Sequence, residues 1–179
     1  MRVVITGATG NVGTSLIEVL GADAGIEAIL GLARRAPRWH PPRTTWAEVD
    51  VAVDELEPHF RGADVVVHLA WIFQPTHDEL ETWRTNVLGS IRVFDAVVAA
   101  GVPALVHASS VGAYSPGPQD HGVDERWPTH ALAHAAYGRE KSYLERVLDA
   151  FELAHPEVRL VRMRPGFIFK RQAAEEQRR

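Results

Sequence analysis

The sequence predicts a single α/β domain built on a doubly wound parallel sheet with helices on both faces. Short apolar runs alternate along the chain with longer stretches of helical periodicity, and this order implies right-handed crossovers between parallel strands. The clearest strand is residues 64–70 (DVVVHLA), because three consecutive valines suit a strand that is covered on both faces. A glycine-rich segment follows the first apolar run, as is typical of this class of fold.

The other elements follow in order from their own patterns. The first strand is Val3-Val4-Ile5, and the helix at 12–20 begins directly after the glycines. The long helix at 80–100 ends at Gly101, with Pro103 just beyond it. The remaining strands are expected at 28–33, 45–49, 104–109 and 158–163, and the last long helix at 135–153. Two irregular segments, 35–44 and 115–130, are expected to form surface loops.

Composition excludes several classes of protein. The chain has 179 residues, a net charge of −4 and interspersed acids and bases, which gives no case for nucleic-acid binding. The absence of cysteine removes disulfides and thiolate nucleophiles, and the nine histidines show no metal-ligand spacing, so no metal is expected. No signal peptide is recognisable, and no apolar run approaches the roughly 20 residues that span a bilayer. We therefore expect a cytoplasmic protein with no membrane partner.

The segment TGATGNVG at 6–13 lies between the first strand and the first helix. Glycine is needed where a backbone turns sharply and where it must approach a pyrophosphate closely, and the helix start offers free N–H groups to that pyrophosphate. A glycine-rich turn without a ligand is the alternative. The strand before and the helix after favour a Rossmann-type dinucleotide site. Its expected contacts are Gly7, Thr9, Gly10, Asn11, Val12 and Gly13.

The end of the second strand bears on the choice of cofactor. A carboxylate there would bond the ribose 2′-hydroxyl of NAD, but this chain has Arg34 and Arg35, whose guanidinium groups can pair with a 2′-phosphate. NADP is therefore expected, with NAD as the alternative. Both arginines could instead only be solvated. After the third strand, Asp50, followed by Val51, could accept a hydrogen bond from adenine or merely cap the next helix.

Tyr137 and Lys141 are four residues apart and thus share one helical face. A tyrosine that transfers protons near neutral pH needs a pKa below about 10, and a nearby ammonium favours this. An ordinary surface pair is the alternative. The pair follows the fifth strand, which ends in HASSVGAY at 107–114, so it should return to the ligand-binding edge beside Ser110. No G-x-S-x-G elbow surrounds Ser109 or Ser110, which disfavours a hydrolase.

Together these motifs resemble the extended short-chain dehydrogenase/reductase family, also called the NAD-dependent epimerase/dehydratase family. The resemblance covers essentially the whole chain, through TGATGNVG at 6–13, HLAW at 68–71, NVLGSIRVFDAVVAAGV at 86–102, HASSVGAY at 107–114, YGREK at 137–141 and RPGFIF at 164–169. It implies an NAD(P)-dependent oxidoreductase or epimerase that acts on a small carbonyl or alcohol substrate. A cofactor sensor without catalysis is the alternative.

The resemblance also implies a role for each matched residue. Tyr137 would be the general acid or base, Lys141 would lower its pKa and bond the nicotinamide ribose, and Ser110 would orient the substrate. Asn86 would support the geometry of the fourth strand or a water relay, or it could simply cap its helix. Leu69, Ala70 and Trp71 would line the cofactor cleft, and Pro165 would lie near the carboxamide; Trp71 could instead be core.

Two departures from the family pattern concern the substrate. Phe167 replaces an asparagine that would bind a nucleotide sugar, and Ser115 stands where glycine is frequent in the family. These departures favour a carbonyl or alcohol substrate that is less polar than a nucleotide sugar. We also expect a dinucleotide-binding domain at 1–169 and a charged tail at 170–179, where a C-terminal substrate-binding region would begin. Without that region the chain could bind cofactor and turn over nothing. Family resemblance further implies a homodimer through the helices near 80–100 and 136–153.

Overall fold

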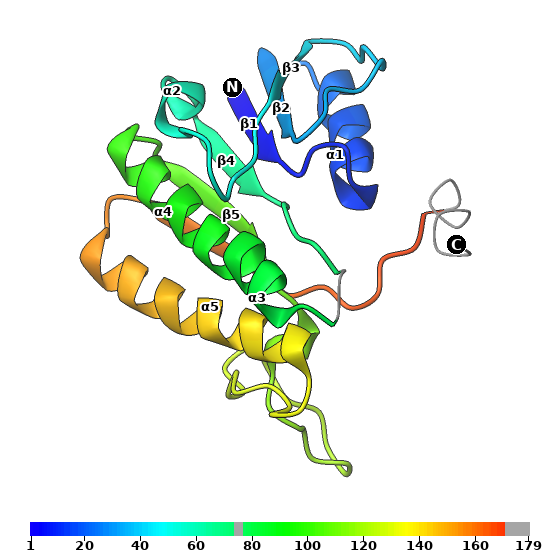
Figure 1. Cartoon of the computed structure of the whole chain (residues 1–179), viewed down its shortest axis with the longest axis vertical. Coiled ribbons are helices and arrows are strands. Elements are labelled where there is room, and N and C mark those ends of the chain that lie inside the picture. The colour runs from blue at the N-terminus through cyan, green and yellow to red at the C-terminus, as the bar shows by residue number, and fades with distance from the viewer. Residues whose placement is uncertain (74–76, 171–179) are drawn as a thin grey trace.

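The computed structural model describes residues 1–73 and 77–170. The predicted tail therefore lies outside the described residues except for Lys170. Six strands form one sheet: β1 (Arg2–Thr6), β2 (Ala28–Ala33), β3 (Thr44–Glu48), β4 (Val65–His68), β5 (Ala104–Ala108) and β6 (Arg159–Met163). Their order is β3-β2-β1-β4-β5-β6 and every pairing is parallel (Figure 1).

This order confirms the predicted doubly wound sheet. The chain steps outward from β1 to β3, returns to β4 on the other side of β1, and steps outward again to β6. The direction of winding therefore reverses between β1 and β4. In open parallel sheets, ligands bind at the carboxyl ends of the strands on either side of such a reversal.

The helices cover the two faces of the sheet unequally. They are α1 (Asn11–Ala22), α2 (Glu57–Phe60), α3 (Glu79–Thr82), η1 (Trp83–Leu88), α4 (Gly89–Ala99), η2 (Val111–Ala113) and α5 (Ala136–Ala154). Ile17 of α1 packs against Val3 and Ile5 of β1 on one face. On that same face, Val67, Val106 and Val161 of the other half of the sheet are only half-buried.

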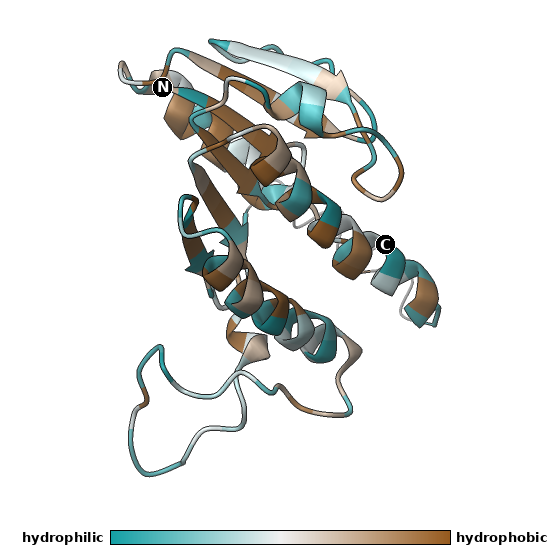
Figure 2. Cartoon of the chain, turned by 90° about the vertical axis from the view of Figure 1, so that its left-hand side faces the viewer, coloured by the Kyte–Doolittle hydropathy of each residue, from teal (hydrophilic) through white to brown (hydrophobic). Residues whose placement is uncertain are grey.

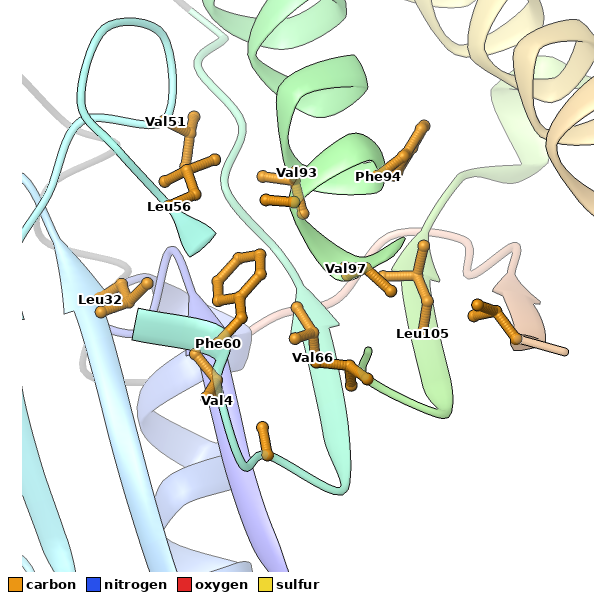
Figure 3. Close-up of a cluster of buried hydrophobic side chains, with 14 of the residues drawn as sticks. Val4, Leu32, Val51, Leu56, Phe60, Val66, Val93, Phe94, Val97 and Leu105 are labelled. Carbon is orange, nitrogen blue, oxygen red and sulfur yellow. The ribbon is translucent and has the colours of Figure 1, made fainter. Parts of the chain in front are cut away.

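The larger core fills the opposite face, where α2, α4 and α5 pack against the sheet. Figure 3 shows Phe60 of α2 and Val97 of α4 beside Val66 of β4 and Leu105 of β5. In Figure 2 the strands are largely brown, because their residues are mostly hydrophobic. Burial of these side chains removes apolar surface from water, which is the main favourable contribution to folding.

Two findings differ from the sequence-based expectations. The helix predicted at 80–100 is not uniformly α-helical, since Trp83–Leu88 forms a π-helical stretch between α3 and α4. A π turn holds one extra residue and is frequent at functional sites. The short helix α2 was not predicted; its four residues include Pro58 in the first turn and are too few to show a helical period.

Helix α5 carries the tyrosine and the lysine to the carboxyl edge of the sheet. Leu144, Leu148 and Phe151 recur at helical spacing and are buried in the larger core. This stripe fixes the rotation of the helix about its axis. Its first two turns, with Tyr137 and Lys141, consequently lie next to η2, which follows β5.

Candidate functional site

The loop between β1 and α1 has a shape that only glycine permits at two positions. Gly7 has a φ of +66°, and a Cβ atom there would lie 2.6 Å from the backbone nitrogen of Ala70. A Cβ atom on Gly13 would lie 2.6 Å from the carbonyl oxygen of Gly7. The loop is thereby pressed against the end of β4 on one side and the start of α1 on the other.

The start of α1 supplies hydrogen-bond donors to this loop. Gly10 is the N-cap, and the amide of Thr14 is the first to bond back to it, at 3.0 Å. The amides of Asn11, Val12 and Gly13 therefore have no partner within the helix. A bare cradle of glycine backbone that ends in a helix N-terminus fits a dinucleotide pyrophosphate. Thr9 and Val12 are exposed at its rim.

The segment after β4 continues along the loop. The amide of Leu69 donates to the carbonyl oxygen of Thr6 at 3.1 Å, and the amide of Ala70 donates to the hydroxyl of Thr6 at 3.4 Å. On the far side, the carbonyl oxygen of Pro165 accepts from the amide of Val111 at 3.1 Å. Leu69, Ala70 and Pro165 thus reach the carboxyl edge at which the cofactor cleft was expected.

The expected adenosine end lies beside β2 and β3. Arg34 and Arg35 are exposed directly after β2, and no ion-pair partner is found for either among residues 1–73 and 77–170. Asp50 accepts from the amide of Ala52 at 2.9 Å, so one of its carboxylate oxygens caps a turn, and no helix begins there. Val51 is buried in the larger core.

The structure separates the two serines that follow β5. The hydroxyl of Ser109 donates to Glu145 Oε1 at 2.5 Å, inside a buried network in which Arg164 also binds both oxygens of Glu145. The hydroxyl of Ser110 accepts from the amide of Gly112 at 3.0 Å, and Gly112 lies against the ring of Tyr137. Ser110, and not Ser109, is therefore the serine that lies beside the tyrosine.

Tyr137 is enclosed by aromatic side chains from the segment after β4. Its ring stacks on Phe73 at 5.3 Å between centroids and meets Trp71 edge-on at 5.6 Å. Burial raises the pKa of Tyr137 above its ordinary value, and the hydrogen bond with Ser110 lowers it in part. A lowered tyrosine pKa was expected. In this structure the pKa is raised, because burial of the phenol outweighs the other influences.

The ammonium of Lys141 lies closer to the ring of Trp71 than to that of Tyr137. Its ammonium donates to the carbonyl oxygen of Ala108 at 2.7 Å and lies 3.3 Å above the centre of the Trp71 ring, but 5.9 Å from that of Tyr137. Burial lowers the pKa of Lys141 to about 7, although the carboxylates of Glu140 and Glu145 oppose this. Trp71 thus covers the ammonium that the family resemblance assigns to the nicotinamide ribose.

Asn86 lies in the π-helical stretch and is completely buried. Its Oδ1 accepts from the amide of Ile72 at 2.8 Å, and its Nδ2 donates to the carbonyl oxygen of Ile72 at 2.9 Å. The same nitrogen donates to Glu140 Oε2 at 2.8 Å. Asn86 accordingly holds the segment after β4 against α5. It affects the site through these two neighbours.

A small open pocket of about 70 Å³ lies beside Tyr137. Its lining consists of Trp71, Ile72, Phe73, Glu79, Thr82, Ala136, Tyr137 and Glu140. Sequence reasoning missed Phe73 and Glu140; the spacing of Glu140 three residues after Tyr137 was the signal available for the latter. Phe167, which departs from the family pattern, is 93% exposed and does not line this pocket.

Residues 1–73 and 77–170 show neither a metal site nor a membrane-spanning helix. No group of three or more histidine or acidic side chains in these ranges could hold a metal ion. None of the helices described in them is long and apolar enough to cross a membrane.

Comparisons with known proteins agree with this geometry. A family model described as "NAD dependent epimerase/dehydratase family" matches residues 3–175. An undecaprenol-diphosphate-linked N-acetylglucosamine 4-epimerase of Escherichia coli O157:H7 is 32% identical over 94% of this chain and 49% of its own length. L-arabinose 1-dehydrogenase (NAD(P)(+)) of Haloferax volcanii is 33% identical over 61% of this chain and 41% of its own length.

The fold is also shared with solved structures. The UDP-glucose 4-epimerase of Thermus thermophilus, in complex with NAD, superposes with a TM-score of 0.77 at 27% identity. That match covers 92% of this chain and 54% of the epimerase. The chain spans about half the length of the relatives it matches. A parallel sheet in the expected order, a glycine cradle and a family model that matches nearly every residue show that the chain belongs to the NAD-dependent epimerase/dehydratase family.

Proposed function

We propose that this chain carries the cofactor-binding and catalytic part of an NAD(P)-dependent oxidoreductase or epimerase. The observation that carries the proposal is that Ser110 and Lys141 lie near Tyr137, beside the segment after β4 that also contacts Gly7. Family membership supports it, because the named relatives include epimerases and a dehydrogenase. The substrate is a small molecule that presents an alcohol or a carbonyl group to Tyr137.

Each of these residues has a separate role in the proposed oxidation of an alcohol. A bound nicotinamide supplies the acceptor for the hydride that leaves the carbon. In its phenolate form, Tyr137 takes the hydroxyl proton, and Ser110 holds the substrate oxygen. Lys141 would hold the nicotinamide ribose, and its ammonium would favour the phenolate form of Tyr137. Reduction of a carbonyl uses the same groups in reverse, and an epimerase does both steps in turn.

The cofactor is proposed to be NADP, with NAD also accepted. Arg34 and Arg35 stand exposed at the end of β2, where a 2′-phosphate would lie. The Haloferax relative is named as an NAD(P)(+) enzyme, whereas the Thermus structure holds NAD. Titration with each nucleotide tests this. Arg34→Ala and Arg35→Ala should reduce NADP affinity and leave NAD affinity unchanged, with Arg38→Ala as the matched control. Equal effects on both nucleotides would contradict it.

A sugar is the substrate class that the relatives support best. The Escherichia and Thermus relatives are named as sugar epimerases, and the Haloferax relative is named for an aldose. Phe167 gave weight to a less polar substrate, but its exposed position away from the pocket removes that argument. We therefore include sugars and sugar nucleotides in the proposal.

The decisive experiment measures cofactor binding and turnover separately. Wild-type protein with NAD or NADP is offered a panel of sugars, sugar nucleotides and simple alcohols, and reduced nicotinamide is followed at its absorbance band. Tyr137→Phe should keep cofactor affinity and lose turnover by about a hundredfold or more, since general acid–base catalysis contributes that much. Unchanged turnover would refute the role of Tyr137. Cofactor binding without turnover in wild-type protein would instead favour a sensor.

A homodimer through the long helices is also proposed. Leu80 of α3, Leu88 of η1 and Tyr143 of α5 are exposed on the helices that the family resemblance assigns to the interface. Analytical ultracentrifugation tests this. We expect the wild-type protein to sediment as a dimer and the Leu88→Lys variant to sediment as a monomer. A wild-type protein that is monomeric at high concentration would overturn the proposal.

A further inference from the structure

Glu140 is a carboxylate almost completely enclosed beside the catalytic tyrosine. It is 5% exposed, and its helical spacing from Tyr137 puts both side chains in the lining of the same pocket. An ionised carboxylate can accept about four hydrogen bonds. Among the described residues Glu140 accepts one, from Asn86 Nδ2 at 2.8 Å. A buried carboxylate with so few donors is costly unless further donors are supplied.

The cations near the pocket are engaged elsewhere. Lys141 gives its ammonium to Ala108 and to the face of Trp71. Arg139 pairs with Glu79 at 2.9 Å on the rim of the pocket. No ion pair of Glu140 is found in residues 1–73 and 77–170. The negative charge that faces this pocket is therefore balanced by no contacting cation of the described chain.

The polar groups of the pocket lining do not bond to Glu140 among the described residues. Trp71, Ile72, Phe73 and Ala136 line the pocket mainly with apolar groups, and the Trp71 Nε1 and the hydroxyl of Thr82 make no hydrogen bond with Glu140. A molecule that enters beside Tyr137 can therefore bring a donor to the acceptor positions of Glu140. A hydroxyl group provides one donor and an ammonium provides three, whereas a carboxylate provides none and would face Glu140 with like charge.

We propose that Glu140 is a specificity-determining residue that accepts hydrogen bonds from a hydroxyl or ammonium group of the substrate and excludes a carboxylate at that position. This rests on the proposed function and narrows its substrate class to neutral or cationic polyhydroxylated molecules, as against uronic acids. Asn86 orients the Glu140 carboxylate through its Nδ2 and at the same time fixes Ile72 on the opposite wall. The buried amide of Asn86 thus positions one residue on each of two walls of the pocket.

Matched pairs of probes test this assignment. UDP-glucose and UDP-glucuronate differ only by a hydroxymethyl group and a carboxylate, and so do galactose and galacturonate as the free-sugar pair. Binding of each to the NAD-loaded protein is measured by calorimetry. The neutral member should bind at least about a hundredfold more tightly, since apposed like charges are strongly unfavourable in a desolvated site.

Two variants separate specificity from folding. Glu140→Gln keeps the shape of the side chain and removes its charge. It should reduce the ratio of the affinity for the neutral probe to the affinity for the acidic probe at least about tenfold. Glu157→Gln, at an exposed carboxylate beyond the other end of α5, should leave the ratio unchanged. The ratio is taken within one protein, so a general loss of stability cancels. An unchanged ratio in Glu140→Gln, a wild-type preference for the uronate, or no binding of either neutral probe would overturn the proposal. Failure to bind NAD, by contrast, would overturn the proposed function itself.

Discussion

Two buried histidines should make the protein lose stability in mild acid. His68 and His107 lie side by side in β4 and β5, with ring centroids 5.3 Å apart. His68 bonds to Thr6 and Ser90, whereas both ring nitrogens of His107 are buried and find no partner among the described residues. Burial lowers the pKa of His68 to about 3, with a smaller effect from Lys141, and burial also places the pKa of His107 well below its ordinary value.

The sign follows from the direction of these shifts. The folded state keeps both rings neutral, while in the unfolded state they take up protons below pH about 6.5. The unfolded state therefore binds more protons, and the free energy of unfolding falls as the pH falls. Between pH 7 and pH 5 each ring contributes a loss of about 2 kcal/mol, at about 1.4 kcal/mol per pH unit once below 6.5. A combined loss of about 4 kcal/mol is large beside a total stability of about 5–15 kcal/mol.

Urea unfolding followed by circular dichroism at pH 7, 6 and 5 measures this loss. His107→Leu should remove about half of it, and it should also raise stability at pH 7 by about 1–3 kcal/mol, since two unpartnered buried nitrogens disappear. His121→Gln, at an exposed ring, is the control and should keep the wild-type pH dependence. The lowered pKa of Glu145 acts only below its ordinary value of 4.5, outside this window. Equal wild-type stability at pH 7 and pH 5 would refute the reasoning.

Three further predictions concern the site and its support. Selective ¹³C labelling of the two lysines should show one signal, that of Lys141, titrating near pH 7 because burial disfavours its ammonium; a midpoint above 9 would contradict this. Gly7→Ala should cost at least roughly 1–3 kcal/mol in chemical denaturation and abolish cofactor binding, because φ is +66° and the new Cβ meets Ala70, whereas Gly117→Ala, which meets nothing within 4 Å, should be neutral. Arg164→Met should cost roughly 1.5–3 kcal/mol by the same measurement, since Glu145, which is 1% exposed, would lose its bidentate partner but keep Arg162 and Ser109. Arg126→Met, at an exposed pair, should leave the midpoint unchanged, and equal effects would show that the buried network carries no special weight.

Sequence patterns predicted the sheet well because most of its strands are short, largely apolar runs that alternate with longer stretches of helical periodicity. The limits of the strands shifted by one or two residues, as at β3, which was expected at 45–49 and occupies Thr44–Glu48. The π-helical stretch could not be predicted, since one extra residue in a turn barely changes the apolar spacing of α3 and α4. Helix α2 was missed for lack of length.

Local sequence motifs were enough to point to four residues of the candidate site. Gly7, Ser110, Tyr137 and Lys141 were found from local spacing and from their places after particular strands. What local spacing could not reveal was the environment of Tyr137, whose pKa depends on Phe73 and Trp71 from a segment more than sixty residues away. The choice between Ser109 and Ser110 likewise depends on Glu145, which belongs to another element.

The π-helical stretch sets the kind of mutation that this region can accept. Successive residues of an α-helix are rotated by about 100° around the axis, so one extra residue changes the phase of all that precede it. Val93, Phe94 and Val97 lock α4 into the core, and its rotation cannot adjust. Deletion of a single residue between Asn86 and Leu88 would therefore turn Asn86 away from Ile72 and Glu140 together. The number of residues in this helix therefore determines the direction in which Asn86 points. Among related proteins, insertions and deletions at this point should be rarer than substitutions.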